Sequence, residues 1–295
     1  MATTSAEVKA SEKRQWTYKI AKSSVYPTSL DAINDRVAAL RPLSAQPNAG
    51  VLPVIRAYCS PLYLCVDVDE QVAVEQLGAR EQFVPFSSSA ASPTIPDEEA
   101  SAVVLAVAET LSRLHARGVV HGHVHVDVVR RHVADPRRVV LLEAELPMSA
   151  LVPQGVVGAE ARRCAAPEIL RGAPYGGAAD VWGLGVLLLQ LLSEQAKTCS
   201  TADLVDSDLL SPFLSTLSPQ ALSFVLPCLK GDSSARPLLW NVMQHPFLAS
   251  FREMEMAGVT DTTGRSPQNS SSSSTEVEAD TDDESDEEST SGDSF

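Results

Sequence analysis

Three histidines, His121, His123 and His125, occupy alternate positions in one short stretch of this chain. Residues two apart on a β-strand point to the same face, so on a strand the three imidazoles would lie side by side. Imidazole nitrogens bind Zn²⁺, and the carboxylate of the nearby Asp127 is a further donor. The sequence supplies no second cluster of ligands to complete such a site. We therefore favour histidines that serve the fold or the surface over a metal centre.

A second group of side chains with possible chemistry lies near the C-terminus. From Ser266 onward the chain carries ten acidic residues and neither Lys nor Arg. Acidophilic kinases phosphorylate a Ser or Thr that has an acidic residue three positions later, and five residues fit: Ser273, Thr275, Thr281, Ser285 and Thr290. Each phosphate would add about 1.5–2 negative charges and help the tail dock on a basic partner. A solvated tail that only aids solubility is the alternative.

The segments around the histidines have the periodicities of regular structure. Val103, Val107 and Leu111 recur at helical spacing and predict a helix over 98–115. Further helices are expected at 178–194, 218–229 and 237–249. The N-terminal part favours strands at 16–22, 51–56 and 61–68, with one helix at 31–43. A small β-rich region before a larger helical one predicts an α+β protein of two lobes.

Composition and charge restrict the class of protein. The formal net charge is −15, of which the tail carries ten units, so the remainder is near −5 and offers no basic face for nucleic acid. The five cysteines form no CxxC pair, as expected in a reducing compartment. The longest apolar run, Val186 to Leu192, is too short to cross a membrane. We expect an intracellular protein, cytoplasmic or nuclear, that binds neither nucleic acid nor membrane.

The chain resembles the protein kinase family from about residue 16 to residue 250. Three ordered motifs carry the resemblance: Ala166, Pro167 and Glu168 match its Ala-Pro-Glu, Asp180, Trp182 and Gly185 match its Asp-x-Trp-x-x-Gly, and Arg236 matches its late Arg. The resemblance implies a kinase-like fold, with the family's Glu–Arg ion pair formed here by Glu168 and Arg236. The expected organisation is a disordered N-terminus (1–15), a reduced β-rich lobe (16–72), a helical lobe (73–252) and a disordered acidic tail (253–295).

The same resemblance shows that the catalytic residue types have changed. Aligned on the lead-in from Leu114 to His121, the position of the catalytic Asp is His123. The Asn that binds the second metal becomes Val128, which offers no oxygen to Mg²⁺. Glu143 stands in place of the metal-binding Asp. Because phosphoryl transfer depends on positioning and charge neutralisation, these changes predict loss of activity.

The phosphate-binding parts are altered as well. The first glycine of the chain is Gly50, after the entire N-terminal region, so we expect the Gly-rich loop to be absent. Lys22, or with less support Lys19, stands where the family has its strand lysine. The helix position that should carry its Glu partner falls near Arg36, which would repel a lysine.

A second register of the catalytic loop keeps some chemistry. Shifting the alignment by four residues makes Asp127 the catalytic base and places His132 at the Asn position. Glu143 or Glu145 would then bind the metal. This register needs four extra residues after Gly118, so we prefer the first.

Between Glu145 and Ala166 the sequence has Ser149 but no clear Thr or Tyr switch site.

The leading prediction is a catalytically inactive kinase-like domain, a pseudokinase with no catalytic residue, cofactor or metal, that acts as a scaffold or allosteric partner of another protein. That partner would be an active kinase or a larger complex. The alternative is a divergent, weakly active Ser/Thr kinase that uses ATP and Mg²⁺ through Lys22, Asp127 and Glu143.

Overall fold

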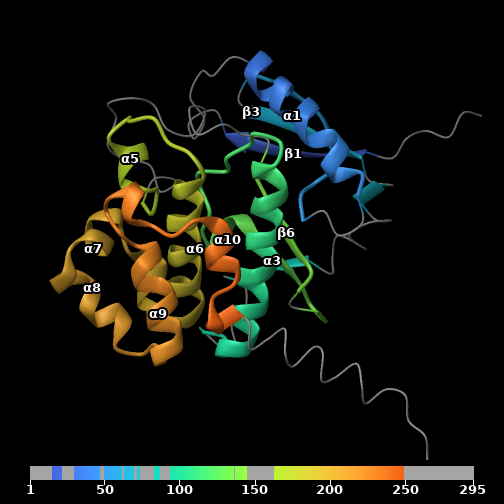
Figure 1. Cartoon of the computed structure of the whole chain (residues 1–295). Coiled ribbons are helices and arrows are strands. Elements are labelled where there is room, and N and C mark those ends of the chain that lie inside the picture. The colour runs from blue at the N-terminus through green and yellow to red at the C-terminus, as the bar shows by residue number, and fades with distance from the viewer. Residues whose placement is uncertain are drawn as a thin grey trace, which may run out of the picture.

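The computed structural model describes residues 15–21, 30–46, 50–61, 63–69, 72–73, 83–86, 94–135, 137–144 and 163–248. Within them, a smaller part of one sheet and one helix sits on a larger body of helices (Figure 1). This is the α+β, two-lobed plan that the sequence predicts. Most of both predicted disordered ends, together with the five tail phosphorylation sites, lies outside the described residues.

The sheet of the smaller part contains β1 (Gln15–Ala21), β2 (Val54–Cys59) and β3 (Tyr63–Asp69), all antiparallel, in the order β1-β3-β2. The central strand places Asp67, only 1% exposed, between its two neighbours. Its carboxylate accepts hydrogen bonds from Thr17 Oγ1 on β1 at 2.6 Å and from Arg56 Nε on β2 at 2.9 Å. One buried acid thus links the three strands, as buried charges require partners.

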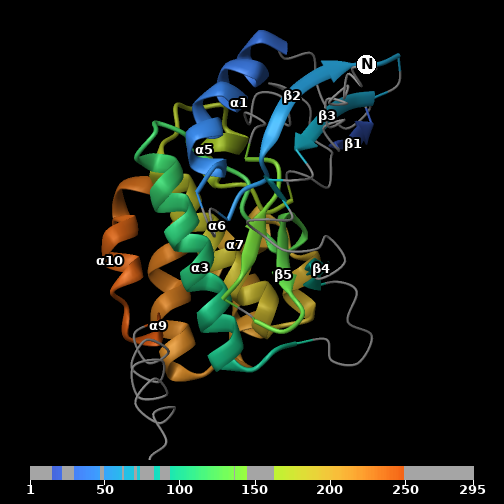
Figure 2. The same cartoon turned by 90° about the vertical axis from the view of Figure 1, so that its right-hand side faces the viewer.

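Helix α1 (Leu30–Ser44) packs along β2 through buried Ile33, Val37 and Leu40 (Figure 2). Asn34 fixes the register of this contact. Its side-chain amide donates to the Ala57 carbonyl oxygen at 3.2 Å, and its oxygen accepts from the Ala57 N–H at 3.0 Å. Because β2 is the last strand of the sheet, these bonds satisfy backbone groups on its outer edge.

A second small sheet flanks the helical body. It comprises β4 (Phe83–Pro85), β5 (Val129–His132) and β6 (Val139–Leu141), in that order and antiparallel. Val51 forms an isolated bridge to Leu141. Since Val51 lies just before β2, this bridge connects the smaller part to the larger one.

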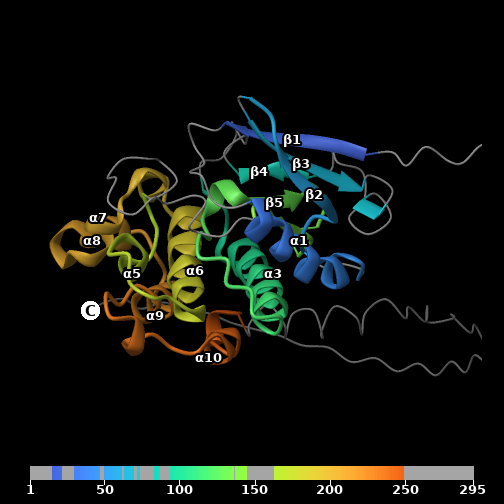
Figure 3. The same ribbon diagram turned by 90° about the horizontal axis from the view of Figure 1, so that it is seen from above.

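The body is built around α6 (Gly177–Leu192), which runs beside α3 (Asp97–His115) (Figure 3). α6 is apolar on all sides and almost wholly buried, as expected of a central helix. A Cβ on Gly183 would lie 2.7 Å from Val124 Cβ, and one on Gly185 would lie 2.8 Å from Cys228 Cβ. The two glycines therefore allow close packing against the segment of Val124 and against α9 (Pro219–Cys228).

Shorter helices complete the body: α5 (Pro167–Leu170), α7 (Thr201–Val205), α8 (Ser207–Leu214) and α10 (Leu239–Met243), with the 3₁₀ turns η3 (Val126–Val128), η5 (Gln195–Thr198) and η6 (Ser233–Ala235). The prediction of one helix over 237–249 is wrong, because α10 ends at Met243. Pro246 lacks an amide hydrogen and disfavours helical geometry at the preceding residue. Among the described helices, none combines the length and the apolar character needed to cross a membrane.

Candidate functional site

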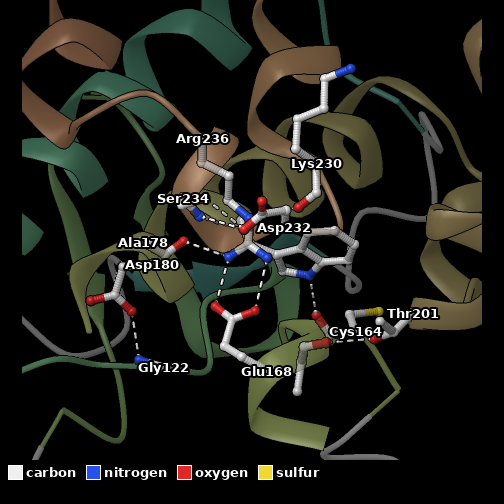
Figure 4. Close-up of polar contacts among 12 residues, drawn as sticks. Gly122, Cys164, Glu168, Ala178, Asp180, Thr201, Lys230, Asp232, Ser234 and Arg236 are labelled. Atoms are coloured by element: carbon white, nitrogen blue, oxygen red, sulfur yellow. Dashed lines mark hydrogen bonds and ion pairs between the residues drawn. The ribbon is translucent and has the colours of Figure 1, made fainter. Parts of the chain in front are cut away.

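The histidines lie in a loop, residues 119–125, between α3 and η3, and not on a strand. Asp180, fully buried on α6, holds this loop through its backbone. Its carboxylate accepts from the N–H of His121 at 3.0 Å and from the N–H of Gly122 at 2.5 Å, the latter shown in Figure 4. A third contact joins the carboxylate to His115 Nε2 at 2.7 Å. Asp180 of the Asp-x-Trp-x-x-Gly motif thus positions the loop.

Both ring nitrogens of His121 are engaged within the fold. Nε2 lies 2.9 Å from the Leu142 carbonyl oxygen, and Nδ1 accepts from the N–H of His123 at 3.2 Å. This network assigns the proton to Nε2. Burial lowers the pKa of His121 to about 4, so the ring is neutral at physiological pH. His121 therefore positions the loop and has no lone pair left for a metal ion.

His123, which the preferred alignment predicts at the position of the catalytic Asp, is 5% exposed. Its Nδ1 lies 3.6 Å from a carboxylate oxygen of Glu143, and neither of its ring nitrogens has a hydrogen-bond partner among the described residues. The ring of His125 packs edge-on against it, with centroids 4.4 Å apart. Burial lowers the pKa of His125. The two rings thus pack together in a poorly solvated place.

Glu143 faces these rings from the turn after β6. Burial alone would raise the pKa of its carboxyl, but the imidazole of His123 and its neighbours lower it below the ordinary value. The backbone of Glu143 has φ 63°, in the left-handed region that non-glycine residues avoid. Nearby, Val128 is an apolar side chain only 4% exposed. The Glu143 carboxylate therefore lies beside imidazoles.

Asp127, the base of the alternative register, lies in η3 with its side chain 68% exposed. Its carboxylate lies 3.6 Å from His125 Nδ1, and this neighbour lowers the pKa of Asp127. In the described part of the chain, no three side chains of His, Cys, Asp or Glu are grouped so that they could hold a metal ion. The alternating histidines therefore do not converge on one ion.

Arg36 occupies a place that the sequence did not predict. From α1 its Nε donates to the Ala144 carbonyl oxygen at 2.7 Å, and its Nη2 donates to the Val120 carbonyl oxygen at 2.6 Å. Burial lowers the pKa of the guanidinium. Arg36 thus ties α1 to the loop on one side of the site and to the turn of Glu143 on the other. The sequence gives one indication of this role: a basic residue stands on this helix near the position where the resemblance implies a glutamate.

The lysines expected to face Arg36 are less informative. Lys22 lies outside the described residues, and so does Glu145. Lys19 lies in β1, where its backbone is paired with Cys65 of β3. The expected repulsion between Arg36 and a lysine therefore stays a prediction; the contacts described for Arg36 are its hydrogen bonds to carbonyl groups.

The second motif residue of interest is Glu168, which forms a bidentate pair with Arg236 (Figure 4). The two N–H···O distances are 2.7 and 2.8 Å, and both side chains are buried. Arg236 also donates to the Ala178 and Lys230 carbonyl oxygens and stacks over the ring of Trp182 at 5.1 Å. The ion pair that the resemblance implies is present, with every arm of the guanidinium used.

Comparison with known proteins agrees with this arrangement. The family described as "Protein kinase domain" matches residues 156–248. The chain is similar to the human serine/threonine-protein kinase PAK 4, with 29% identity over 166 residues that cover 52% of this chain and 27% of the relative. It is also 25% identical over 180 residues to calcium/calmodulin-dependent protein kinase type I of Schizosaccharomyces pombe, covering 57% of this chain and 53% of that one. A crystal structure of Rad53 1-466 in complex with AMP-PNP shares the fold, with a TM-score of 0.55 and 16% identity over 79% of this chain and 58% of that chain.

The chain therefore has a kinase-like fold, and its residues 156–248 match the protein kinase domain. It spans between about a quarter and a half of the length of these curated relatives. Within this kinase-like domain, Glu168 of α5 and Asp180 of α6 make buried contacts that hold the fold.

Proposed function

We propose that this kinase-like domain is catalytically inactive, a pseudokinase, and acts inside the cell through contacts with other proteins. It would serve as a scaffold or as an allosteric partner of an active kinase or a larger complex. The observation that carries the proposal is His123. This residue is buried, with 5% of its surface exposed. In the preferred alignment it takes the position of the carboxylate that orients a substrate hydroxyl in the family.

The metal-binding positions support the same proposal. Mg²⁺ takes hard oxygen ligands in octahedral geometry. Val128 supplies none, and the Glu143 carboxylate already faces the ring of His123. Removing one electrostatic contact of a catalytic site typically slows a reaction about 10²–10³-fold, so combined losses leave little rate. We therefore expect no bound ATP or metal cofactor.

The helical lobe offers surfaces for partners. Leu238 and Trp240, at the start of α10, are 72% and 68% exposed. Large exposed apolar side chains are typical of contact sites. In the smaller part, β1 pairs only with β3 among the described strands, and an open strand edge is a template for pairing. The acidic tail, with its five phosphorylation sites, is a further proposed contact for a basic partner.

One observation favours the alternative of a divergent Ser/Thr kinase. Asp127 is exposed, and His125 lowers its pKa, so it is an ionised carboxylate that solvent can reach. In that case Glu143 or Glu145 would bind Mg²⁺ and Lys22 would bind ATP. The two functions differ in nucleotide binding and in phosphoryl transfer, so each can be measured separately.

Nucleotide binding is tested by thermal unfolding with ATP, alone and with Mg²⁺ or Mn²⁺. A ligand present at 100 times its Kd stabilises the native state by about 2.7 kcal/mol, which gives a measurable rise in Tm. We expect no metal-dependent rise. A clear shift that requires the metal ion would contradict an empty nucleotide site.

Phosphoryl transfer is tested with radiolabelled ATP on the wild type, Asp127→Ala and the control Asp208→Ala. Asp208 is an exposed residue of α8, away from the histidine loop. We expect equal background incorporation in all three. Activity that disappears in Asp127→Ala and persists in Asp208→Ala would establish the divergent kinase instead.

Partner binding is tested by affinity purification with the full chain, the chain without residues 257–295, and Trp240→Ser. A partner of the tail is lost with the truncation, and a partner of α10 is lost with the substitution. The scaffold proposal fails if the full chain enriches no protein above an unrelated acidic control protein.

A further inference from the structure

Two cysteines that are 35 residues apart in sequence meet in the helical lobe. Cys164 precedes α5, and Cys199 lies between η5 and α7. The Cys164 thiol donates to the Cys199 carbonyl oxygen at 3.1 Å, so the two cysteines are neighbours in space. Cys199 is 2% exposed, whereas Cys164 is partly accessible. A solute can therefore reach Cys164, whereas Cys199 is shielded from solvent.

The backbone around both residues is held in place. Thr201 N–H donates to the Arg163 carbonyl oxygen at 2.5 Å, and Thr201 Oγ1 donates to the Ala165 carbonyl oxygen at 2.6 Å. Trp182 Nε1 donates to the carbonyl oxygen of Cys164 at 2.9 Å, a contact drawn in Figure 4. The segments of Cys164 and Cys199 thus lie side by side with little freedom to separate. A disulfide forms without strain only between cysteines that the backbone holds close together.

The surroundings also make Cys164 the more reactive thiol. The hydrogen bond with Cys199 is the largest cause that lowers the pKa of Cys164, and the charge of Arg163 and the amide of Gln190, whose Nε2 lies 3.5 Å from Sγ, act in the same direction. The hydrogen bond with Cys164 and, after it, burial raise the pKa of Cys199. The thiolate is the nucleophile in thiol chemistry, so reaction begins at Cys164.

We propose that Cys164 and Cys199 are a redox-sensitive pair that closes to a reversible disulfide when the protein meets a hydroperoxide. The Cys164 thiolate attacks the peroxide oxygen, the O–O bond breaks, and a sulfenic acid forms with release of hydroxide or alkoxide. The sulfur of Cys199 then attacks the Cys164 sulfur and expels the hydroxyl group, and its proton goes to the leaving oxygen to give water. The two thiols lose two electrons and two protons in total, and the hydroperoxide is reduced to an alcohol, or water, plus water.

This disulfide would also stiffen the helical lobe around the two cysteines. It would fasten the segment that leads into α5 to the corner between η5 and α7, closing a loop of 35 residues. Closing a loop of this size restricts the unfolded chain and raises Tm, here by about 5 °C or more. A thiol reductant reverses the step. The rigidity of the helical lobe between η5 and α7 would then depend on the redox state of the surroundings. The inference does not depend on whether the domain is catalytic.

The test treats the full wild-type chain with hydrogen peroxide, blocks the remaining thiols with N-ethylmaleimide, and maps the unreduced digest by mass spectrometry. Cys59 serves as an internal control because it is the exposed thiol, and Cys65 and Cys228 are buried controls. We expect peptides linked through Cys164 and Cys199 that separate with dithiothreitol, together with the rise in Tm. Oxidation confined to Cys59, with Cys164 and Cys199 both alkylated, would overturn the proposal.

Two variants keep the test independent of one digest. In Cys199→Ala, Cys164 should be oxidised to sulfenic and then sulfinic acid without a link, and the Tm rise should be lost. The pH at which iodoacetamide half-modifies Cys164 should move upward, since the largest cause of its lowered pKa is removed. Cys59→Ala should form the disulfide like the wild type. A peroxide-induced Tm rise that survives in Cys199→Ala would also contradict the proposal.

Discussion

Glu143 shows at the scale of one residue how the site is shaped by its backbone. A left-handed conformation at a non-glycine residue costs about 1–2 kcal/mol, and at φ 63° Glu143 bears this cost. The turn after β6 is therefore strained at Glu143. The position of the Glu143 carboxylate beside His123 depends on that geometry.

The strain predicts an unusual order of stability at this position. Glu143→Gly should be more stable than Glu143→Ala by about 0.5–1 kcal/mol, because only glycine adopts a left-handed conformation without penalty. Urea unfolding of both variants measures the difference. At Glu109, within the helix α3, the order should reverse and Ala should be favoured by about 1 kcal/mol. Equal stability of the two Glu143 variants would rule out the strain.

The ion pair of Glu168 and Arg236 gives a second prediction for single residues. Glu168→Gln should lower the free energy of unfolding by about 3–5 kcal/mol, since it leaves a buried guanidinium without its anion. Denaturant unfolding measures the loss. Glu109→Gln is the matched control: Glu109 pairs with Arg113 at 3.8 Å near the surface, and its loss should cost at most about 0.5 kcal/mol. Similar losses in the two variants would mean that the buried pair is not structural.

At the scale of elements, helix α1 is held by polar contacts from both of its sides. Asn34 binds the outer edge of β2, and Arg36 binds the carbonyl groups of Val120 and Ala144 in the helical part. The family couples this helix to a strand through a lysine and a glutamate. Here the coupling runs from the helix to the backbone of the other lobe, so it does not require a nucleotide or a lysine.

Arg36→Met should loosen this helix selectively. Two hydrogen bonds to a charged group are lost, worth together about 2–4 kcal/mol, and two carbonyl groups lose a partner. Native-state hydrogen exchange should become faster in α1 while the amides of α6 keep their protection. Arg41→Met, on the same helix, is the control, because Arg41 is exposed and makes one bond, to the Ile55 carbonyl oxygen at 3.0 Å. Unchanged exchange in α1 would show that Arg36 is not a tether.

At the scale of the whole molecule, buried histidines connect stability to pH. His121 has a folded pKa of about 4, well below the usual value near 6.5 in an unfolded chain. Between these two values the unfolded state binds a proton that the folded state does not. Stability is therefore complete above about pH 6.5 and falls as the pH drops toward 4, by about 3 kcal/mol from this group. His125 shifts in the same direction.

Urea unfolding from pH 7.5 to pH 4 measures this dependence. His121→Gln should be less stable at pH 7 but should show a slope smaller by about one proton between pH 6.5 and 4. Asp67, Asp127 and Glu143 have lowered pKa values, so their contributions are lost only at lower pH, below about 4. A free energy of unfolding that stays constant from pH 6.5 to 4.5 would contradict the burial of neutral His121.

Much of the fold follows from residue patterns. The periodic apolar residues of 98–115 and 178–194 give α3 and α6 within a few positions, and the paired strands around residue 60 appear as β2 and β3. The strands β4 to β6 and the helices α5, α7 and α8 are too short for periodicity to reveal. The helix predicted over 237–249 is shorter in the structure, where α10 ends at Met243, before Pro246.

The sequence by itself determined the residue types that an alignment can place at the catalytic positions, because residue type is a local property: His123, Val128 and Glu143 in the preferred register are readable without coordinates. Only the tertiary structure decided which groups lie next to a given side chain. Arg36 donates hydrogen bonds to carbonyl groups 84 and 108 residues away, and the Cys164 thiol donates to the carbonyl oxygen of Cys199. Every residue has a backbone carbonyl, so the sequence cannot mark which one an arginine will bind. That choice depends on how α1, the histidine loop and the turn of Glu143 are brought together in space.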